Sequence, residues 1–333
     1  MKERILALLT ARQGEYISGE AVSEALGVSR AAVWKAVDAL RKDGVAIEAA
    51  PRRGYRLAEA PDRLTAGTVL PHLRERSGEL IVLDTVDSTN NYAKTLAMGG
   101  KGFADGTAIA ADEQTGGRGR QGRSFLSPKG KGVYLTMLWK PDIAPAAAVS
   151  LTACVAVAVC DGIEAAVGVR PGIKWTNDIV LEGRKLCGIL TEMAVEGETG
   201  SLQYLITGIG VNANQTEEDF PPELRPIAVS LAQVLGRPVD RGRLCACLIN
   251  ALDDMYGPWL AGSGDWRRRY REGCLTLGRP VRILRGDRAE EAFAEALDDD
   301  LGLIVRHPDG RRETVTAGEV SVRGLFGYAD DGK

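Results

Sequence analysis

The segment Gly116–Arg123 places four glycines and three arginines within eight residues. Glycine lets a backbone approach a ligand closely, and arginine offers a planar set of donors to carboxylate or phosphate while it stays charged. The flanking segments 107–112 and 133–138 are apolar runs that predict core strands. We therefore predict a globular domain whose loop closes over an anionic ligand. A solvated basic linker and an RNA-contacting tract are the alternatives.

The composition allows several domains and narrows the classes of partner. At 333 residues there is room for two or three domains, and 44% hydrophobic with 26% charged residues is ordinary for a soluble globular protein. A net charge of −3 argues against a protein that coats nucleic acid along its whole surface. It permits one small DNA-reading domain.

Cysteine and histidine usage argues against a structural zinc site. The six cysteines include no Cys-x-x-Cys pair, and the chain has two histidines. Unpaired cysteines and an N-terminus without a signal-peptide pattern indicate a cytoplasmic protein. An uncharged run, 143–160, is weakly hydrophobic and at the short limit for a bilayer span. We predict that it is a buried core helix, and we expect no membrane partner.

Residues 1–60 show the pattern of a winged helix. A first apolar helix precedes two short helices joined by Gly27-Val28-Ser29, where glycine ends one helix and serine caps the next. In this helix-turn-helix pattern the second helix enters the major groove of DNA. A hairpin around residues 51–54 supplies a basic wing for phosphate. The residues expected at DNA are Ser29, Arg30, Ala31, Lys35, Arg52 and Arg53.

A protein-interaction domain is the alternative for this segment, and its charge does not decide between the two. Residues 1–60 carry ten Lys/Arg against eight Asp/Glu, a difference of +2. The neighbours of Trp34 suggest that it packs at the edge of its helix. Residues 58–62, which include Pro61, are the expected linker.

Polar residues follow the ends of predicted strands farther along the chain. Strand 80–83 leads into Asp87-Ser88-Thr89-Asn90 at a helix start. These side chains either cap the helix or join its free backbone donors in binding a ligand. The strand before the loop ends at Gln114, whose amide can bond a flat polar group.

Two further segments carry amide or charged groups beside apolar strands. Residues 174–178, Lys-Trp-Thr-Asn-Asp, suit a nucleotide and its metal, and Asp178 can hold Mg²⁺ directly or through water. After a tight hairpin at 182–183 comes Lys185, which meets a carboxylate or phosphate or is a surface lysine. Residues 208–212, Gly-Ile-Gly-Val-Asn, lack the third glycine and the helix of a dinucleotide-binding fold.

In this order the motifs resemble those of biotin–protein ligases, and the winged helix in front resembles the bifunctional type, the biotin operon repressors. The resemblance covers essentially the whole chain. The glycine-arginine loop and Gly-Arg-Lys-Leu-Cys-Gly-Ile-Leu are its most specific parts. The matching segments are 87–90, 114–123, 174–178, 183–190 and 208–212.

The resemblance implies an α+β multidomain fold. Its parts would be a winged helix-turn-helix at 1–60, a central mixed-sheet, class II synthetase-like ligase domain at 63–272, and an SH3-like β-barrel at 275–327. The sequence itself predicts a small barrel at the C-terminal end, because short alternating strands recur there between turns. The predicted strands are 281–284, 289–293, 301–305 and 319–322, with turns at 285–287 and 308–310.

The resemblance also implies roles for side chains. Arg118 and Lys185 would be catalytic, by stabilising charge. Biotin would be bound by Ser88, Thr89, Asn90, Gln114, Arg118, Gly119, Arg120, Lys185 and Gly188. ATP and the adenylate would be bound by Arg120, Arg123, Asn177, Asp178 and Asn212, with Asp178 as the Mg²⁺ residue.

The implied activity is ATP-dependent and AMP-forming. Biotin and MgATP would give biotinyl-5′-AMP, and a lysine of biotin carboxyl carrier protein, the acceptor in acetyl-CoA carboxylase, would take the biotin. Operator DNA and a second copy of the chain, in a ligand-dependent homodimer, would be further partners. The alternatives are a regulator that senses biotin without catalysis and a lipoate-type ligase.

Three departures from the family pattern bear on the site. Thr176 stands where proline is frequent, and Gln121 stands where arginine is common. Some members place a tryptophan over the adenine, but residues 213–231 contain none. Phe220 or Ile227 can pack there instead.

Overall fold

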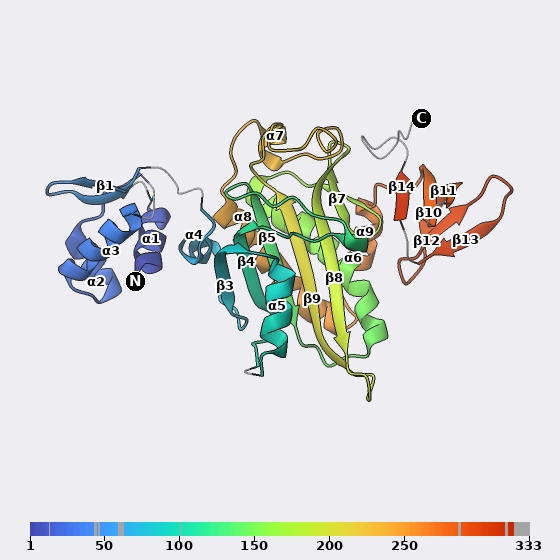
Figure 1. Ribbon diagram of the computed structural model, residues 1–333, viewed down its shortest axis with the longest axis horizontal. Coiled ribbons are helices and arrows are strands. Elements are labelled where there is room, and N and C mark those ends of the chain that lie inside the picture. Colours follow the sequence, from blue (N-terminus) through green and yellow to red (C-terminus); the bar gives the residue numbers. More distant parts are fainter. Residues whose placement is uncertain are drawn as a thin grey trace.

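The chain folds into three parts that lie in a row, with the sheet that carries the predicted motifs in the middle (Figure 1). The computed structural model describes residues 1–333 except 13, 43, 44, 46, 59–62, 101, 286, 287, 317, 318 and 323–333. For residues 3, 121 and 319–322 it describes the backbone alone. Most of the predicted linker, 59–62, lies outside the described residues, as do the expected helix end at Gly44 and the turn residues 286 and 287.

The N-terminal part is the predicted winged helix-turn-helix. Three helices and a two-stranded hairpin enclose one apolar core, and the hairpin turns at residues 51–53, where the basic wing was predicted. Gly54 is required in the wing, because its φ is +102° and a Cβ there would lie 2.1 Å from the Ile17 carbonyl oxygen. The elements are α1 (Lys2–Ala11), α2 (Gly19–Leu26), α3 (Arg30–Lys42), β1 (Ile47–Ala50) and β2 (Gly54–Leu57).

The central part is a seven-stranded mixed sheet of order β3-β4-β5-β9-β8-β7-β6. β3 and β4 are parallel, and the other neighbours are antiparallel. All eight residues of β5 are buried, as expected for a strand covered on both faces. The strands are β3 (Leu80–Val86), β4 (Thr107–Gln114), β5 (Gly132–Trp139), β6 (Gly172–Lys174), β7 (Asp178–Leu181), β8 (Arg184–Val195) and β9 (Leu202–Asn212).

Helices cover the two faces of this sheet unequally. α5 (Thr89–Met98) packs on one face, and α6 (Leu151–Val167), α8 (Arg241–Leu260) and α9 (Trp266–Gly273) lie on the other (Figure 1). The remaining short helices are α4 (Ala66–Val69), η1 (Leu70–His72), η2 (Arg120–Gly122), η3 (Pro145–Ser150) and α7 (Leu231–Leu235).

The uncharged run predicted as one core helix is divided. A 3₁₀ helix, η3, precedes α6, and α6 continues to Val167, seven residues beyond the predicted end. Pro145 sets the start of η3. The helical stretch 145–167 is long and apolar enough to cross a membrane by length and composition. Eleven residues of α6 are buried, so it is the predicted core helix.

The C-terminal part is a five-stranded antiparallel sheet of order β13-β12-β11-β10-β14. The sequence missed β13, because its charged residues Arg312 and Glu313 obscure the alternation. The strands are β10 (Pro280–Arg285), β11 (Arg288–Leu297), β12 (Leu303–Arg306), β13 (Arg312–Val315) and β14 (Glu319–Val322). Trp175 joins this sheet to the central one, since its indole Nε1 donates to the Leu301 carbonyl (2.9 Å).

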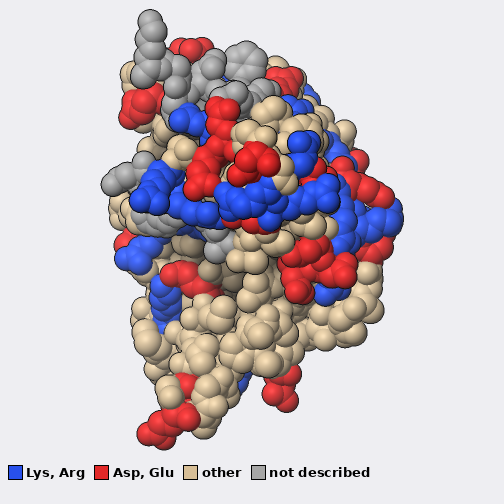
Figure 2. Space-filling view, turned by 90° about the vertical axis from the view of Figure 1, so that its right-hand side faces the viewer, with Lys and Arg blue, Asp and Glu red and all other residues tan. Residues whose placement is uncertain are grey.

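Charged side chains cover the outer face of the C-terminal end. Figure 2 shows a band of Lys and Arg there with Asp and Glu on either side. The acidic groups pair with the basic ones: Glu295 lies 2.6 Å from Arg306 and 2.9 Å from Arg312. Such exposed pairs contribute little to stability, and the two signs largely cancel.

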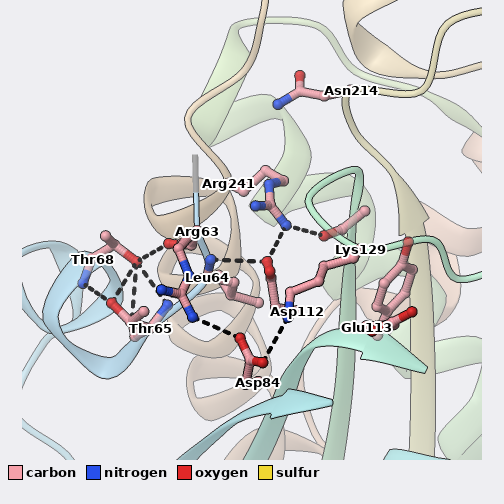
Figure 3. A network of polar contacts seen from close by, with 12 residues as sticks. Arg63, Leu64, Thr65, Thr68, Asp84, Asp112, Glu113, Lys129, Asn214 and Arg241 are labelled. Atoms are coloured by element: carbon pink, nitrogen blue, oxygen red, sulfur yellow. Dashed lines mark hydrogen bonds and ion pairs between the residues drawn. The ribbon is translucent and has the colours of Figure 1, made fainter. Parts of the chain in front are cut away.

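A buried ion pair fixes the end of β4 against α8 (Figure 3). Asp112 and Arg241 are 1% and 3% exposed, and Arg241 Nη1 lies 2.8 Å from Asp112 Oδ1. The same carboxylate oxygen accepts the backbone N–H of Leu64 at 3.0 Å, and Arg241 also donates to the Gly132 carbonyl. These bonds satisfy charges that would otherwise be costly to bury.

Removing one partner of this pair is expected to be strongly destabilising. Arg241→Met leaves the Asp112 carboxylate buried without its guanidinium, so we expect a loss of about 3–5 kcal/mol in the free energy of unfolding. Arg268→Met is the matched control, because Arg268 pairs with Glu272 at the surface and its loss costs about 0–1 kcal/mol. Urea unfolding measures both. Equal, small changes would contradict the role given to the buried pair.

Candidate functional site

A cavity of about 300 Å³ opens beside the glycine-arginine loop, residues 116–123. Its walls come from the start of α5, the end of β4, the loop, the β7–β8 hairpin, β9 and the segment 220–228. Every residue predicted to bind biotin or ATP lines this one cavity. The predicted motif segments, far apart in the chain, therefore meet here.

Neutral polar groups form one end of the cavity. Ser88 is the N-cap of α5, yet its side chain makes no capping hydrogen bond within the described part of the chain. Gln114 replaces it, because its Oε1 accepts the backbone N–H of Thr89 at 2.9 Å. The helix-cap interpretation of this motif is thus wrong for Ser88. Its hydroxyl lines the cavity, as do Thr89 and Asn90.

Two glycines of β9 make room for this end. A Cβ on Gly208 would lie 2.4 Å from Asn90 Oδ1, and a Cβ on Gly210 would lie 2.6 Å from the ring of Phe125. The Gly-x-Gly-x-Asn motif, residues 208–212, forms the end of β9. Its glycines let side chains from α5 and from the loop region approach the sheet.

The glycine-arginine loop is internally bonded. Gly119 N–H donates to the Arg123 carbonyl (2.7 Å), and Phe125 N–H donates to the Gly117 carbonyl (2.9 Å). Arg120 reaches across the cavity to Asn177 Oδ1 (2.9 Å). Arg118 and Arg123 are exposed, and both line the cavity. The loop therefore places three guanidinium groups at the same rim.

A lysine–aspartate pair stands on the opposite wall. Lys185 Nζ lies 2.6 Å from Asp178 Oδ1, across the β7–β8 hairpin. The backbone of Lys185 is fixed from its far side, since its N–H donates to the Ile227 carbonyl (2.8 Å) and its carbonyl accepts from Val229 N–H (3.0 Å). These bonds bring segment 220–228 to the cavity.

Asn212 lines the cavity, and its side chain also makes hydrogen bonds within the cavity wall. Its amide Nδ2 donates to the Val229 carbonyl at 3.2 Å, and its Oδ1 accepts from Gln215 at 3.2 Å. Nearby, Phe220 and Ile227 supply apolar lining. The side chain of Asn212 thus holds the segment that carries these two residues.

The ionisable groups near the cavity favour binding over covalent chemistry by the protein. Burial raises the pKa of the Cys187 thiol, so this cysteine of β8 stays protonated and is a poor nucleophile. At the start of α5, a hydrogen bond from Asn91 lowers the pKa of Asp87. Among the described residues that line the cavity, Asp178 is the one carboxylate, facing Arg118, Arg120, Arg123, Lys174 and Lys185.

Several lining residues were missed by sequence reasoning. Phe125 was missed because it lies just past the charged loop. Lys174, which is 5% exposed, lines the cavity, and the sequence had placed it in the segment 174–178 expected beside a nucleotide. The spacing of the motifs gives no sign that segment 220–228 folds back onto Lys185. Phe220 and Ile227, which the sequence analysis named for the adenine, do line the cavity. The lining residues for which the sequence predicted no role are Ser124, Phe125, Leu126, Ile189, Leu190, Gly208, Ile209, Gly210, Leu224 and Ala228.

The residues predicted to contact DNA lie on the surface of the winged helix. Ser29, Arg30, Ala31 and Lys35 are exposed at the N-terminal half of α3, and Arg52 and Arg53 are exposed in the wing. Trp34 is 60% exposed on α3, so the expectation that it packs at the helix edge is wrong. It belongs to the same exposed surface.

Models of known protein families match each of the three parts of the chain. Residues 82–212 match the Biotin/lipoate A/B protein ligase family, residues 2–56 match the HTH domain, and residues 276–323 match the Biotin protein ligase C terminal domain.

Similar proteins span nearly the whole chain. The Bifunctional ligase/repressor BirA of Bacillus subtilis strain 168 is 36% identical over 95% of this chain and 97% of its own length. The protein of that name from Escherichia coli strain K12 is 33% identical over 96% of each. Among solved structures, Biotin protein ligase from Aquifex aeolicus in complex with biotin and ATP is 28% identical, with a TM-score of 0.61 over 74% of this chain and 98% of that one.

The close packing at Gly208 can be tested through stability. Gly208→Ala places a methyl group against the buried amide of Asn90, and we expect the free energy of unfolding to fall by about 1–3 kcal/mol. Gly197→Ala is the control, because a Cβ there meets nothing within 4 Å and should change stability by no more than about 0.5 kcal/mol. Guanidinium unfolding that shows the two variants alike would contradict the packing described.

Proposed function

The chain belongs to the biotin protein ligase family, in its bifunctional ligase/repressor form, and from that premise we propose how its cavity and its winged helix divide the work. It is a biotin–protein ligase that carries a DNA-binding repressor domain. The observation that supports the cavity as the ligase site is its two-ended lining, with neutral polar groups at α5 and cations at the loop and hairpin. Biotinyl-adenylate has a neutral ring system at one end and an anionic acyl-phosphate group beyond it. The neutral ring would lie at the α5 end and the acyl-phosphate beside the cations.

The reaction proceeds in two steps at the cationic end. The carboxylate of biotin attacks the α-phosphate of ATP, and pyrophosphate leaves. A lysine amine of the acceptor protein then attacks the mixed anhydride, and AMP leaves. Both attacking groups come from substrates, which agrees with the protonated thiol of Cys187.

Electrostatic stabilisation is the main contribution of this chain. Two anions must approach each other in the first step, so positive side chains lower the barrier by stabilising charge at phosphorus. Arg118 and Lys185 have this role, and Arg120 and Arg123 bind the phosphate groups of ATP and of the adenylate. Asp178 orients the Lys185 ammonium, from which it lies 2.6 Å, before the ligand enters.

The cavity also suits a magnesium ion carried in with ATP. Magnesium is bound by one or two carboxylates together with substrate phosphates, and Asp178 is the carboxylate available among the described lining residues. No group of three or more His, Cys, Asp or Glu side chains that could hold a metal occurs among the described residues. Asp178 would hold the ion, with Asn177 beside the phosphates, and the ion would neutralise phosphate charge.

The glycine-arginine loop protects the intermediate. A mixed anhydride hydrolyses in water, so closure of the loop over it preserves the product of the first step. The bond from Arg120 to Asn177 shows one way in which the loop reaches the opposite wall. Adenine packs on the apolar patch of Phe220 and Ile227, in place of the tryptophan of other members.

Two alternatives to this activity remain distinct in their chemistry. A regulator that only senses biotin needs the neutral end of the cavity but not Lys185 or the loop arginines. A lipoate-type ligase keeps those cations but takes a ligand with a dithiolane head. Incubation with ATP, an acceptor domain and either biotin or lipoate separates the three.

The three parts of the chain act as separate modules in this proposal. Residues 1–60 bind operator DNA, residues 63–272 bind biotin and ATP, and residues 275–327 assist ATP or acceptor binding. The acceptor is the biotin carboxyl carrier protein of acetyl-CoA carboxylase in the cytoplasm. Ligand binding in the central part promotes a homodimer, which places two winged helices on one operator.

Loss of either catalytic cation should slow adenylate formation. We expect Lys185→Ala and Arg118→Ala each to reduce the rate of biotinyl-adenylate formation, or its retention, by about 10²-fold. ATP–pyrophosphate exchange and adenylate dissociation measure the two quantities.

Surface variants provide the controls for this experiment. Lys140→Ala and Arg237→Ala remove exposed cations outside the cavity and should leave both rates unchanged. Unchanged rates in the Lys185 and Arg118 variants as well would show that these side chains do not carry the chemistry.

The winged helix should bind DNA with a salt dependence set by its exposed cations. For a duplex carrying the organism's biotin-operon promoter, Arg52→Ala should weaken binding and reduce the slope of log K against log [salt] by about 1. Biotin with ATP should strengthen binding by the unmodified chain. Fluorescence anisotropy at several salt concentrations measures this, and Arg237→Ala is the control. If the slope for Arg52→Ala equals that of the unmodified chain, Arg52 does not contact a DNA phosphate.

A further inference from the structure

We propose that Trp34 is a base-reading residue of the winged helix, whose indole ring contacts the methyl group of a thymine in the operator DNA. The inference rests on the proposed function, in which residues 1–60 bind operator DNA. It goes further, because a contact to a base edge gives sequence preference, whereas the exposed cations of the wing attract phosphate at any sequence.

The exposure of its ring sets Trp34 apart from the other tryptophans of the chain. Trp34 is 60% exposed on α3. The other four tryptophans are at most 6% exposed; they are Trp139, Trp175, Trp259 and Trp266. An apolar ring left in water forgoes the stabilisation that burial gives, and tryptophan is enriched where proteins bind partners. The exposed ring therefore points to a partner outside the chain.

The other aromatic side chains of the winged helix are used within it. The guanidinium carbon of Arg53 lies 4.1 Å from the centroid of the Tyr16 ring, and the Tyr16 hydroxyl donates to Glu48 at 2.9 Å. Tyr55 packs against the apolar core. With the rest of the chain that the structure describes, the indole of Trp34 makes no hydrogen bond or ring contact. Both its faces and its N–H group are thus available to a ligand.

The position of Trp34 on α3 is the one from which a recognition helix reads bases. The buried residues Val33, Ala36, Val37 and Leu40 turn one side of α3 to the core. On the other side, residues 30, 31, 34 and 35 are exposed in the first two turns. In a helix-turn-helix the N-terminal part of the second helix contacts base edges. Ala31, which ends at its Cβ, lets this part approach the floor of the groove.

The charges around Trp34 are those that bind duplex DNA. Arg30 and Lys35 are exposed beside it on α3, and the wing adds further exposed arginines. Asp38, the only carboxylate in the sequence of α3, lies 2.8 Å from Lys42 and is paired there. The cations can contact phosphates on both sides of a groove. The indole ring between Arg30 and Lys35 then meets the base edges.

One group in the major groove matches an apolar ring. The edges of the bases present hydrogen-bond donors and acceptors there, and thymine adds the C5-methyl group. Contact between the indole and this methyl group removes apolar area of both from water. A donor or acceptor under the ring would instead lose its water partner. Trp34 therefore favours a T·A pair at one position of each half-site.

Replacing single thymines of the operator by uracil tests the methyl contact. Uracil lacks the methyl group and keeps the hydrogen-bonding groups of thymine. With biotin and ATP present, we expect the unmodified chain to lose about 4-fold in affinity at one thymine of each half-site, as for one buried methyl group. For Trp34→Ala the same replacement should change affinity by less than about 1.5-fold, because the partner of the methyl group is gone. Fluorescence anisotropy measures both.

Substitutions of Trp34 should change sequence preference and leave the salt dependence alone. Trp34→Ala should weaken binding to the promoter duplex by at least about 10-fold and change binding to a scrambled duplex by less than about 2-fold. The slope of log K against log [salt] should stay the same, because no charge is removed. Trp34→Phe keeps an aromatic ring and should bind within about 3-fold of the unmodified chain.

Met98→Ala is the matched control for these substitutions. Met98 is 70% exposed at the end of α5, outside the winged helix. Its loss removes exposed apolar atoms and should leave binding to both duplexes unchanged. The Tm of each variant should equal that of the unmodified chain, since both side chains lie at the surface.

The fluorescence of Trp34 gives a direct readout of the contact. Acrylamide quenches exposed indole rings, so Trp34 supplies the readily quenched component of the emission, and Trp34→Phe should lack it. The promoter duplex, with biotin and ATP, should protect this component from acrylamide. The scrambled duplex at equal occupancy should protect it less. A merely structural role for Trp34 does not predict this difference.

The outcomes separate this inference from the proposed function. If the unmodified chain with biotin and ATP does not bind the promoter duplex, the repressor part of the proposed function is refuted, and this inference with it. If it binds, the inference is overturned by equal losses of Trp34→Ala on both duplexes, by a uracil series without a Trp34-dependent position, or by unchanged quenching on the promoter. Trp34→Phe binding as weakly as Trp34→Ala would also overturn the methyl contact, in favour of a hydrogen bond from the indole N–H.

Discussion

The buried pair of Asp112 and Arg241 is the interaction on which the site depends most. It fixes the end of β4 against the start of α8. Asp112 lies two residues before Gln114 and four before the glycine-arginine loop. Because both charges are almost fully buried, their geometry tolerates little movement. The fixed end of β4 gives the glycine-arginine loop a defined starting point.

The same pair holds the first residues of the central part. Leu64, which follows the segment between the two parts, donates its backbone N–H to Asp112. Beside it, Arg63 lies 2.8 Å from Asp84, and Asp84 lies 2.6 Å from Lys129, just beyond the loop region (Figure 3). Arg63, at the start of the central part, and Lys129, just beyond the loop, thus both pair with the carboxylate of Asp84.

The cavity has a cationic rim and a neutral polar end, and the two differ in how deeply their side chains are buried. Its cationic rim uses exposed and half-exposed guanidinium and ammonium groups, which can move to meet phosphate. Its neutral end uses buried hydroxyl and amide groups whose directions are fixed by partners in α5, β5 and β8. Buried neutral groups and exposed or half-exposed cations therefore line one cavity.

The sequence by itself determined the winged helix, the loop between two core strands and the polar motif segments, because glycines, caps and apolar periodicity act over short distances. The mixed central sheet was an expectation from the resemblance to biotin–protein ligases. The C-terminal strand β13 and the division of the 143–160 run escaped it, since local charge and a proline obscured the pattern. Only the tertiary structure showed that Phe125 and Leu224 line the cavity, and that Glu192 and Thr136 hydrogen-bond to Asn90. Those relations depend on strand order and register, which bring together residues far apart in the chain.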